Sequence, residues 1–364
     1  MTTKTLAKSP EKSPAKPKAK STAASSASSL AWLDNARILA IFAVIFVHVS
    51  VGVPWQAEAG SPLWIYGMSI DALVRWCVPM FVMVSGALLL EPHADESLRD
   101  FYKKRVSRVL IPLLFWSLLY IVWGYFRENV QEEFSLTYVV KKLASGKPYY
   151  HMWFMFMLAG LYVFTPVFRA VVAGLKTRQL VFFIAMSFGI AAIQSLYEAW
   201  YVGESNLFLT WFLIYVPFFL MGHVVRHHDL PISTGKLAVV TACFAVLVSV
   251  SLCTVSLNTS HGEAGYFFKN LNILNIFLSV SLAFLFKRMT TPLLGDKLTA
   301  AVAPLTFGIY LLHMIPLAYL HDQKEFWGMF SPYVYIPAFS FATLVVTTAL
   351  VWLISRVPYV RKVV

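Results

Sequence analysis

Ten apolar stretches, each long enough to cross a lipid bilayer as a helix, constrain this chain more than any other feature. A helix needs about 20 apolar residues for this, because each residue advances it by only about 1.5 Å. Hydrophobic residues make up 58% of the sequence and charged residues 13%, about half the charged share of a soluble domain. The sequence therefore predicts an all-α, polytopic membrane protein of about ten transmembrane helices. The stretches lie at about 37–55, 68–90, 108–126, 151–172, 180–197, 207–225, 236–256, 267–286, 299–320 and 332–354.

Two of the stretches fit this pattern less well than the others. The one at 180–197 is short, and the one at 299–320 carries Pro304 and Pro316 near its ends. Proline is tolerated in a membrane helix where neighbouring groups satisfy the carbonyl that it frees. Both stretches are therefore kept as predicted spans.

The distribution of basic residues predicts how the chain is oriented. If the N-terminus lies inside, most of the 30 Lys and Arg residues fall on the inner side, including those of loop 99–108. Because basic loops stay in the cytoplasm, both termini are predicted to be cytoplasmic. The same distribution accounts for the net charge of +12, so no nucleic-acid partner is predicted.

Residues 1–28 are predicted to form a disordered basic tail, since Lys, Pro, Ser and Ala dominate them. The tail lacks the apolar core of a signal peptide, so no cleavage is expected. Its lysines can rest on anionic membrane lipids, although a solvated tail without a specific role explains them equally simply. The three cysteines lie inside apolar stretches without paired spacing, which indicates neither a disulfide framework nor a metal site.

The first apolar stretch contains two ionisable residues, Arg37 and His48, separated by ten residues without formal charge. Eleven steps of about 100° bring both side chains to nearly one helix face, roughly 16 Å apart along the axis. If Arg37 marks the inner boundary, His48 lies near the middle of the bilayer. An ionisable group at that depth indicates function by default; the alternative is a neutral histidine bonded to a neighbouring helix.

Two further groups of charged residues lie near helix ends. Asp71 and Arg75 have i,i+4 spacing, so either they neutralise each other or Arg75 faces the same cavity as His48. Arg105 and Arg108 share a helix face, and guanidinium groups suit phosphate well. A cytosolic anionic ligand and simple positive-inside topology both explain this second group, which comprises Lys103, Lys104, Arg105 and Arg108.

Two further stretches, the first of them predicted to lie on the outer side, carry additional candidate residues. In the stretch from Pro148 onward, Tyr149, Tyr150 and Trp153 are typical of an interfacial aromatic belt, whereas His151 is unexpected there. Aromatic side chains also serve in sugar binding. The stretch TFGIYLLH supplies a second intramembrane histidine, which favours a polar cavity in the bundle. The candidate substrate-binding residues are His151, Trp153, Tyr310 and His313.

Five stretches in order resemble the membrane-bound acyltransferase 3 family, in particular its O-acetyltransferases of cell-surface polysaccharide such as enterobacterial common antigen. They are Arg37 with His48, VPMFVMVSGALLL, KKRVSRVLIPLLFWSLLY, HMWFMFMLAGLY and TFGIYLLH. The resemblance covers about residues 33–355, which would form one transmembrane acyltransferase domain. Thr306 stands where the late motif often has Ser, a departure that keeps the hydroxyl group.

The resemblance implies a multi-pass protein of the bacterial cytoplasmic (inner) membrane that moves an acyl group from acyl-CoA, most simply acetyl-CoA, to a hydroxyl of an extracytoplasmic glycan or lipid-linked saccharide. It implies Arg37 and His48 as the paired catalytic positions, and Arg105 and Arg108 near the coenzyme A phosphates. His48 would act as general base or carry the acyl group, and Arg75 could stabilise the oxyanion. No metal is expected.

Two other classes of function use the same features. A transporter or flippase of polysaccharide or lipid would use the buried polar residues as a pathway. A structural subunit of a polysaccharide-export complex would not need Arg37 and His48. Consumption of acyl-CoA by the purified protein separates an enzyme from both.

Overall fold

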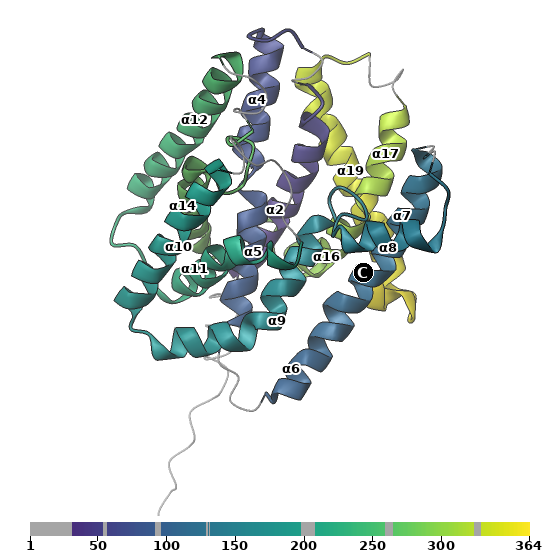
Figure 1. Ribbon diagram of the computed structural model, residues 1–364. Coiled ribbons are helices and arrows are strands. Elements are labelled where there is room, and N and C mark those ends of the chain that lie inside the picture. Colours follow the sequence, from purple (N-terminus) through teal and green to yellow (C-terminus); the bar gives the residue numbers. More distant parts are fainter. Residues whose placement is uncertain are drawn as a thin grey trace, which may run out of the picture.

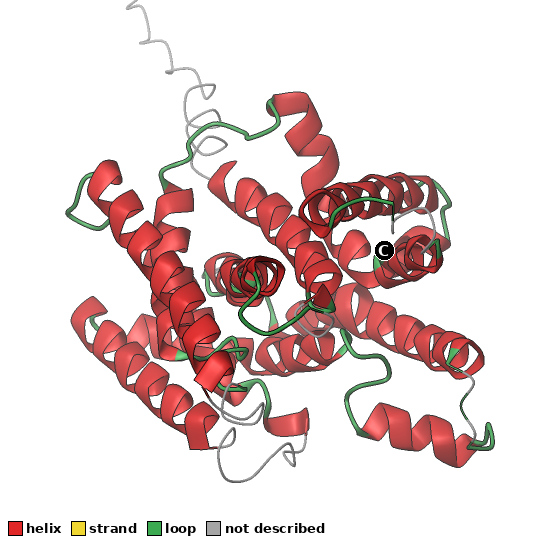
Figure 2. Ribbon diagram, turned by 90° about the horizontal axis from the view of Figure 1, so that it is seen from above, coloured by secondary structure: helices red, strands yellow, loops and turns green. Residues whose placement is uncertain are grey.

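The computed structural model describes residues 31–53, 57–91, 96–128, 130, 132–197, 208–258, 265–323 and 329–364. Every regular element within these ranges is a helix, and loops join the helices at their ends (Figures 1 and 2). The predicted all-α fold class is therefore confirmed. The predicted disordered tail, residues 1–28, lies outside the described residues.

The helices correspond to the apolar stretches, although several stretches consist of more than one helix. The first half of the chain forms α2 (Ala31–Ser50), α4 (Pro62–Val74), α5 (Cys77–Leu89), α6 (Leu98–Arg105), the π-helix η1 (Val106–Leu110), α7 (Ile111–Arg127), α8 (Leu136–Ala144) and α9 (Trp153–Gly174). The second half forms α10 (Thr177–Tyr197), η3 (Phe208–Thr210), η4 (Leu213–Tyr215), α11 (Val216–His227), α12 (Thr234–Asn258), α14 (Ile273–Lys287), α15 (Asp296–Val302), η5 (Ala303–Leu305), α16 (Thr306–Leu312), α17 (Met314–Asp322), α19 (Pro332–Ser355) and η6 (Val360–Val363).

Within the described ranges, eight helical segments are long and apolar enough to cross a membrane. The predicted span at 267–286 forms only the 15-residue α14, and the one at 299–320 is broken between α16 and α17, where the axis bends by 61°. Pro316 explains this break, because it has no N–H to donate to the carbonyl of Leu312 and its ring clashes with that carbonyl. His313 lies at the break.

Helix α2 lies at the centre of the bundle, where it contacts α4, α5, α14, α16 and α19 (Figure 1). The backbones of α5 and α11 approach each other closely at two glycines. A Cβ atom on Gly86 would lie 1.8 Å from the carbonyl oxygen of Phe219, and one on Gly222 would lie 1.9 Å from that of Met83. Only glycine fits at either position.

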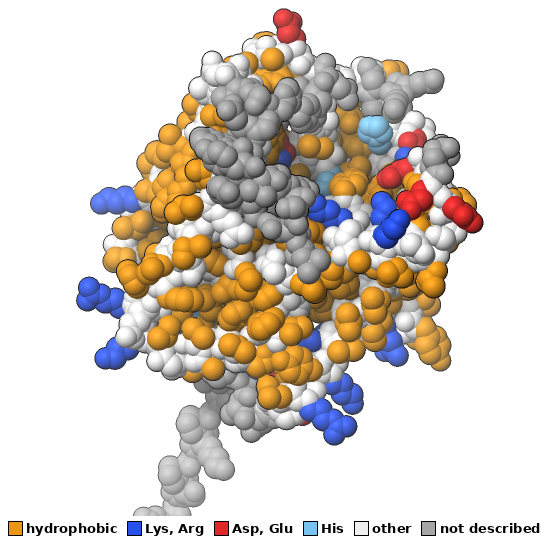
Figure 3. All heavy atoms as spheres, viewed as in Figure 1, with side chains coloured by type: hydrophobic (Ala, Val, Ile, Leu, Met, Phe, Trp, Pro, Cys, Tyr) orange, Lys and Arg blue, Asp and Glu red, His pale blue; other side chains and the backbone are white. Residues whose placement is uncertain are grey.

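The outer surface of the bundle is apolar. On α7, Ile111, Leu114, Phe115, Leu118 and Val122 are exposed at helical spacing, whereas Trp116 and Tyr120 point into the core. Hydrophobic side chains cover much of the face seen in Figure 3, and most of its Lys and Arg side chains project near the edges. Soluble monomers rarely expose large contiguous apolar patches. The surface is that of a protein surrounded by lipid.

Candidate active site

Helix α2 carries the two residues that the sequence singled out first. The helix begins at Ala31, well before the predicted start at residue 37, and ends at Ser50. That predicted start was wrong because Trp32 and Leu33 are buried and extend the apolar helix, while Asp34 pairs with Arg37 at 3.3 Å. His48 lies in the last turn of the helix. The two residues remain about 16 Å apart along the helix axis.

Three imidazole rings from separate parts of the chain meet in the interior. They belong to His48 on α2, His151 just before α9, and His313 at the break between α16 and α17. The ring centroids of His48 and His313 are 5.3 Å apart, and those of His151 and His313 are 5.2 Å apart. His151 and His313 are buried, with exposed fractions of 3% and 0%. We call these three residues the histidine cluster.

The ring of His313 has one tautomer when it is neutral. Its Nδ1 donates a hydrogen bond to the carbonyl of Tyr310 at 2.7 Å, so the proton is on Nδ1 and the lone pair is on Nε2. That Nε2, together with both ring nitrogens of His151, is buried without a hydrogen-bond partner. Buried polar atoms in proteins nearly always have a partner. Unpartnered buried nitrogens of this kind are typical of a site that binds a polar ligand.

Tyrosine rings surround the histidine cluster and fix its backbone. The Tyr310 hydroxyl donates to the carbonyl of His151 at 2.6 Å, and the Tyr120 hydroxyl donates to the carbonyl of Leu311 at 2.7 Å. The Tyr120 ring centroid is 4.8 Å from that of His151. Nothing in the sequence distinguishes Tyr120 from the other aromatic residues of its apolar helix, so sequence reasoning missed it.

On another side of the cluster, Tyr150 provides a connection to the surface. Its ring centroid lies 5.3 Å from that of His48, and 50% of the residue is exposed. Trp153, although predicted to bind substrate, packs against Tyr215 and Phe154 with ring centroids 6.0 Å and 6.2 Å away. Of the four candidate substrate-binding residues, the structure thus brings His151, Tyr310 and His313 together, whereas the ring contacts of Trp153 lie elsewhere.

The guanidinium of Arg75 is engaged by its own neighbours. Its Nε and Nη2 lie 2.7 Å and 2.6 Å from Oδ2 of Asp71, and its Nη1 donates to the carbonyl of Phe268. Asp71 is buried, so the two charges neutralise each other, which is one of the two alternatives left by the sequence.

A second group of polar side chains lies where α6 packs against α9. The guanidinium carbons of Arg105 and Arg169 each lie 4.9 Å from the ring centroid of Phe101, and Arg105 lies 5.8 Å from that of Tyr162. Nε of Arg105 and Nη2 of Arg169 are buried without a hydrogen-bond partner. We call Arg105 and Arg169 the arginine cluster.

Arg169 is the member of the arginine cluster that sequence reasoning missed, since it was considered only as a topology signal. Its Nε donates to the carbonyl of Leu89 at 2.7 Å. Nothing else in the sequence indicates that this single arginine, at the predicted inner end of an apolar helix, belongs to a site. Only the packing of α9 against α6 brings it to the ring of Phe101.

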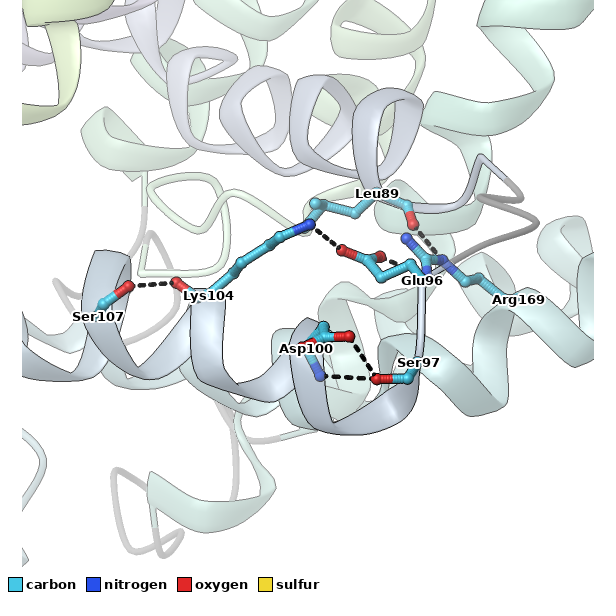
Figure 4. Close-up of polar contacts among 7 residues, drawn as sticks. All are labelled: Leu89, Glu96, Ser97, Asp100, Lys104, Ser107 and Arg169. Carbon is cyan, nitrogen blue, oxygen red and sulfur yellow. Dashed lines mark hydrogen bonds and ion pairs between the residues drawn. The ribbon is translucent and has the colours of Figure 1, made fainter.

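Glu96 balances part of this positive charge, as Figure 4 shows. It accepts hydrogen bonds from Lys104 at 2.9 Å and Arg169 at 3.2 Å. The hydrogen bond from Lys104 holds the pKa of the Glu96 carboxyl below its usual value, so the group is ionised at neutral pH. Lys104 is thereby neutralised. Of the predicted donor-binding residues, Lys103 and Arg108 are exposed and Arg105 is half-buried in the arginine cluster.

The fold and these two clusters define a multi-pass membrane protein with a polar site inside its helix bundle. The chain belongs to the acyltransferase 3 family, because the family pattern described as an acyltransferase domain matches residues 30–356. The resemblance to this family noted in the sequence is confirmed.

Curated relatives agree with this family. Glucans biosynthesis protein C of Salmonella gallinarum (strain 287/91 / NCTC 13346) and its counterparts in Salmonella typhi and Salmonella typhimurium are each 24% identical to this chain over 224 residues. The aligned part is 54% of this chain and 58% of each relative. The chain therefore matches a little more than half the length of these relatives. No solved structure shows a significant match to it.

Proposed function

We propose that this membrane protein is an O-acyltransferase, which moves an acyl group, most simply acetyl, from cytoplasmic acyl-CoA to a hydroxyl of an extracytoplasmic glycan or lipid-linked saccharide. The observation that carries the proposal is the histidine cluster, with its unpartnered ring nitrogens inside an apolar bundle. Imidazole is the side chain best suited to accept and return a proton near neutral pH. Acyl transfer to a hydroxyl group requires such a base.

The arginine cluster supports an anionic donor. Two guanidinium groups with unpartnered nitrogens lie beside aromatic rings, and such groups recognise phosphate through charge-assisted hydrogen bonds. In the proposal, Arg105 and Arg169 hold the coenzyme A phosphates with help from Arg37 and Arg108. The pantetheine arm then extends along α2 over the roughly 16 Å that separate the levels of Arg37 and His48.

The chemistry follows from the residues at the histidine cluster. His48 takes the proton from the acceptor hydroxyl, and the oxygen attacks the carbonyl carbon of the thioester. Stabilisation of the resulting oxyanion by Arg75 would require its guanidinium to leave Asp71 or the Phe268 carbonyl. When the intermediate collapses, the carbon–sulfur bond breaks and the coenzyme A sulfur leaves with the proton from His48. The alternative route, in which His48 itself carries the acyl group, uses the same cluster.

The acceptor enters from the side of Tyr150 in this proposal. Tyr150 combines surface exposure with a direct ring contact to His48, and aromatic rings are suited to contact sugars. His151, Tyr310 and His313 then line the inner part of the acceptor site. The names of the relatives refer to glucan biosynthesis, which supports a glycan as the acceptor.

The proposed orientation places both termini in the cytoplasm of a bacterial cell, with the protein in the inner membrane. The support is the concentration of Lys and Arg on one side of the predicted topology and the bacterial source of the relatives. With this orientation, the arginine cluster faces the compartment that holds acyl-CoA.

The test is transfer by the purified protein. The full chain in detergent is incubated with radiolabelled acetyl-CoA and glycan extracted from the cell envelope, and the products are analysed by mass spectrometry. The proposal predicts an alkali-labile ester on the glycan and release of free coenzyme A, both lost in His48→Ala. Label that never leaves the thioester would support the transporter alternative and overturn the proposal.

A further inference from the structure

A third group of polar side chains lies away from both clusters, where α5 and α11 end together. Glu91 follows the end of α5, and His223 and His227 lie one helical turn apart on α11. One ligand atom from each residue can be chosen so that all three lie within 4.8 Å of one another. The positions of the cysteines predicted no metal site, whereas this i,i+4 histidine pair is a separate feature of the sequence.

The distances within this group fit a single metal ion. Oε1 of Glu91 lies 2.5 Å from Nε2 of His227 and 3.7 Å from Nδ1 of His223, and the two imidazole centroids are 4.4 Å apart. A tetrahedral zinc ion with bonds of about 2.0–2.1 Å holds its ligand atoms about 3.3 Å apart. The two carboxylate distances lie on either side of that value, so small side-chain rotations suffice for coordination.

The types of side chain indicate which metal fits. Two neutral imidazoles and one carboxylate are the ligands of zinc-class transition metals, whereas magnesium and calcium take oxygen ligands. Nδ1 of His223 is buried without a hydrogen-bond partner, which a metal–ligand bond would resolve. The His227 side chain is 40% exposed, so an ion can enter from solvent and retain a water as its fourth ligand.

Arg226 is the charged side chain that faces this group. Its Nε lies 3.5 Å from Oε1 of Glu91, but its Nη1 donates to the carbonyl of Ala87 at 2.7 Å, so that backbone contact holds the guanidinium. His228, next in the chain, instead contacts the hydroxyl of Thr177 with its Nε2 at 3.4 Å. His228 therefore lies outside the group although it adjoins it in sequence.

We infer that Glu91, His223 and His227 bind one zinc-class divalent ion, which fastens the end of α5 to α11. These are the helices whose backbones meet at Gly86 and Gly222. The ion would also fix Glu91, which lies five positions before Glu96 in the sequence. The inference is independent of the proposed acyl transfer.

The test measures metal binding directly. The full chain is purified in detergent through a tag without histidine, stripped with chelator, and titrated with Co²⁺ while visible absorption is recorded. We expect the absorption bands of tetrahedral Co²⁺, saturation at one ion per chain, and loss of the bands on adding Zn²⁺. His227→Ala and His223→Ala should each weaken binding at least about 10-fold, since even loss of an outer partner of a ligand typically costs about 10- to 100-fold.

The matched control is His228→Ala, which removes a neighbouring histidine without touching the group and should bind Co²⁺ like the unaltered chain. Only variants that elute as a single species on size exclusion are compared; the exposed His227 provides a variant that is expected to fold. Absence of a saturable Co²⁺ spectrum in the unaltered chain would overturn the inference. So would a spectrum that survives in the His223→Ala, His227→Ala double variant.

Discussion

The imidazole rings of His48 and His313 lie 5.3 Å apart, centre to centre, although one belongs to the last turn of the first described helix and the other to the break between α16 and α17. His313 is held by its bond to the Tyr310 carbonyl, which leaves Nε2 as its free nitrogen. The break at Pro316 is what places that ring inside the bundle. The relationship links a helix distortion to the proposed chemistry.

His48→Ala should reduce acyl transfer by about 100- to 10,000-fold, the usual effect of losing a general base. The side chain is only partly buried, so expression and membrane insertion should be unchanged. Transfer is measured as glycan acylation in cells that contain only the variant. The exposed His321 provides the control His321→Ala, which should retain activity. Near-normal acylation with His48→Ala would end the catalytic role of this residue.

His313→Asn should separate a chemical role of this histidine from a structural one. The asparagine amide can still donate to the Tyr310 carbonyl, but the variant lacks Nε2. A buried hydrogen bond is worth about 1–3 kcal/mol, so kcat/KM for the acceptor should fall about 10- to 100-fold. Steady-state kinetics on the purified variant measure this. If His313→Asn behaves like the unaltered protein while His313→Phe fails to fold, the residue serves only the helix break.

Arg105→Ala together with Arg108→Ala should raise the KM for acyl-CoA more than it lowers kcat, because phosphate contacts far from the thioester supply binding. The half-buried Arg105 should account for more of the effect than the exposed Arg108. Lys176→Ala with Arg178→Ala is the matched control, since it removes two exposed charges from the same predicted side. An unchanged KM for the donor would indicate that these basic residues only orient the protein in the membrane.

Sealed vesicles of known orientation should accept the two substrates from opposite faces. Arg37 and His48 lie about 16 Å apart along α2, with the Arg37 end predicted inside and the Tyr150 side predicted outside. Acyl-CoA should therefore support transfer only from the cytoplasmic face, and the glycan only from the other. Transfer with both substrates on one face of tight vesicles would refute the proposed path of the acyl group through the protein.

Gly86→Ala should destabilise the bundle, because its new Cβ atom would lie 1.8 Å from the carbonyl oxygen of Phe219. Overpacking of this kind typically costs about 1–3 kcal/mol, and more where backbone has to move. Gly189→Ala on α10 is the control, since nothing lies within 4 Å of its added atom. The melting temperature in detergent should fall for the first variant and stay level or rise for the second. Equal temperatures would show that α5 and α11 separate at little cost.

The sequence by itself determined the fold class, the approximate position of each helix and the family. These depend on local properties: the length of an apolar run fixes whether a helix can cross a bilayer, and motifs in order identify a family. Helix ends depend also on contacts of the residues around them. Arg37 looked like a boundary, yet its pairing with Asp34 lets α2 continue to Ala31. The predicted straight span at 299–320 is bent near Pro316, which is also a local effect. The sequence shows the proline but does not give the angle of the bend.

The tertiary structure alone decided which polar residues meet. A helix that is apolar on all sides has no hydrophobic face to show which way its few polar residues point. The meeting of His48, His151 and His313 therefore depends on how three segments pack. Packing also brings Arg169 to Arg105 across the Phe101 ring, and pairs Lys104 with Glu96. Because such contacts join residues far apart in the chain, spacing within a single helix could not reveal them.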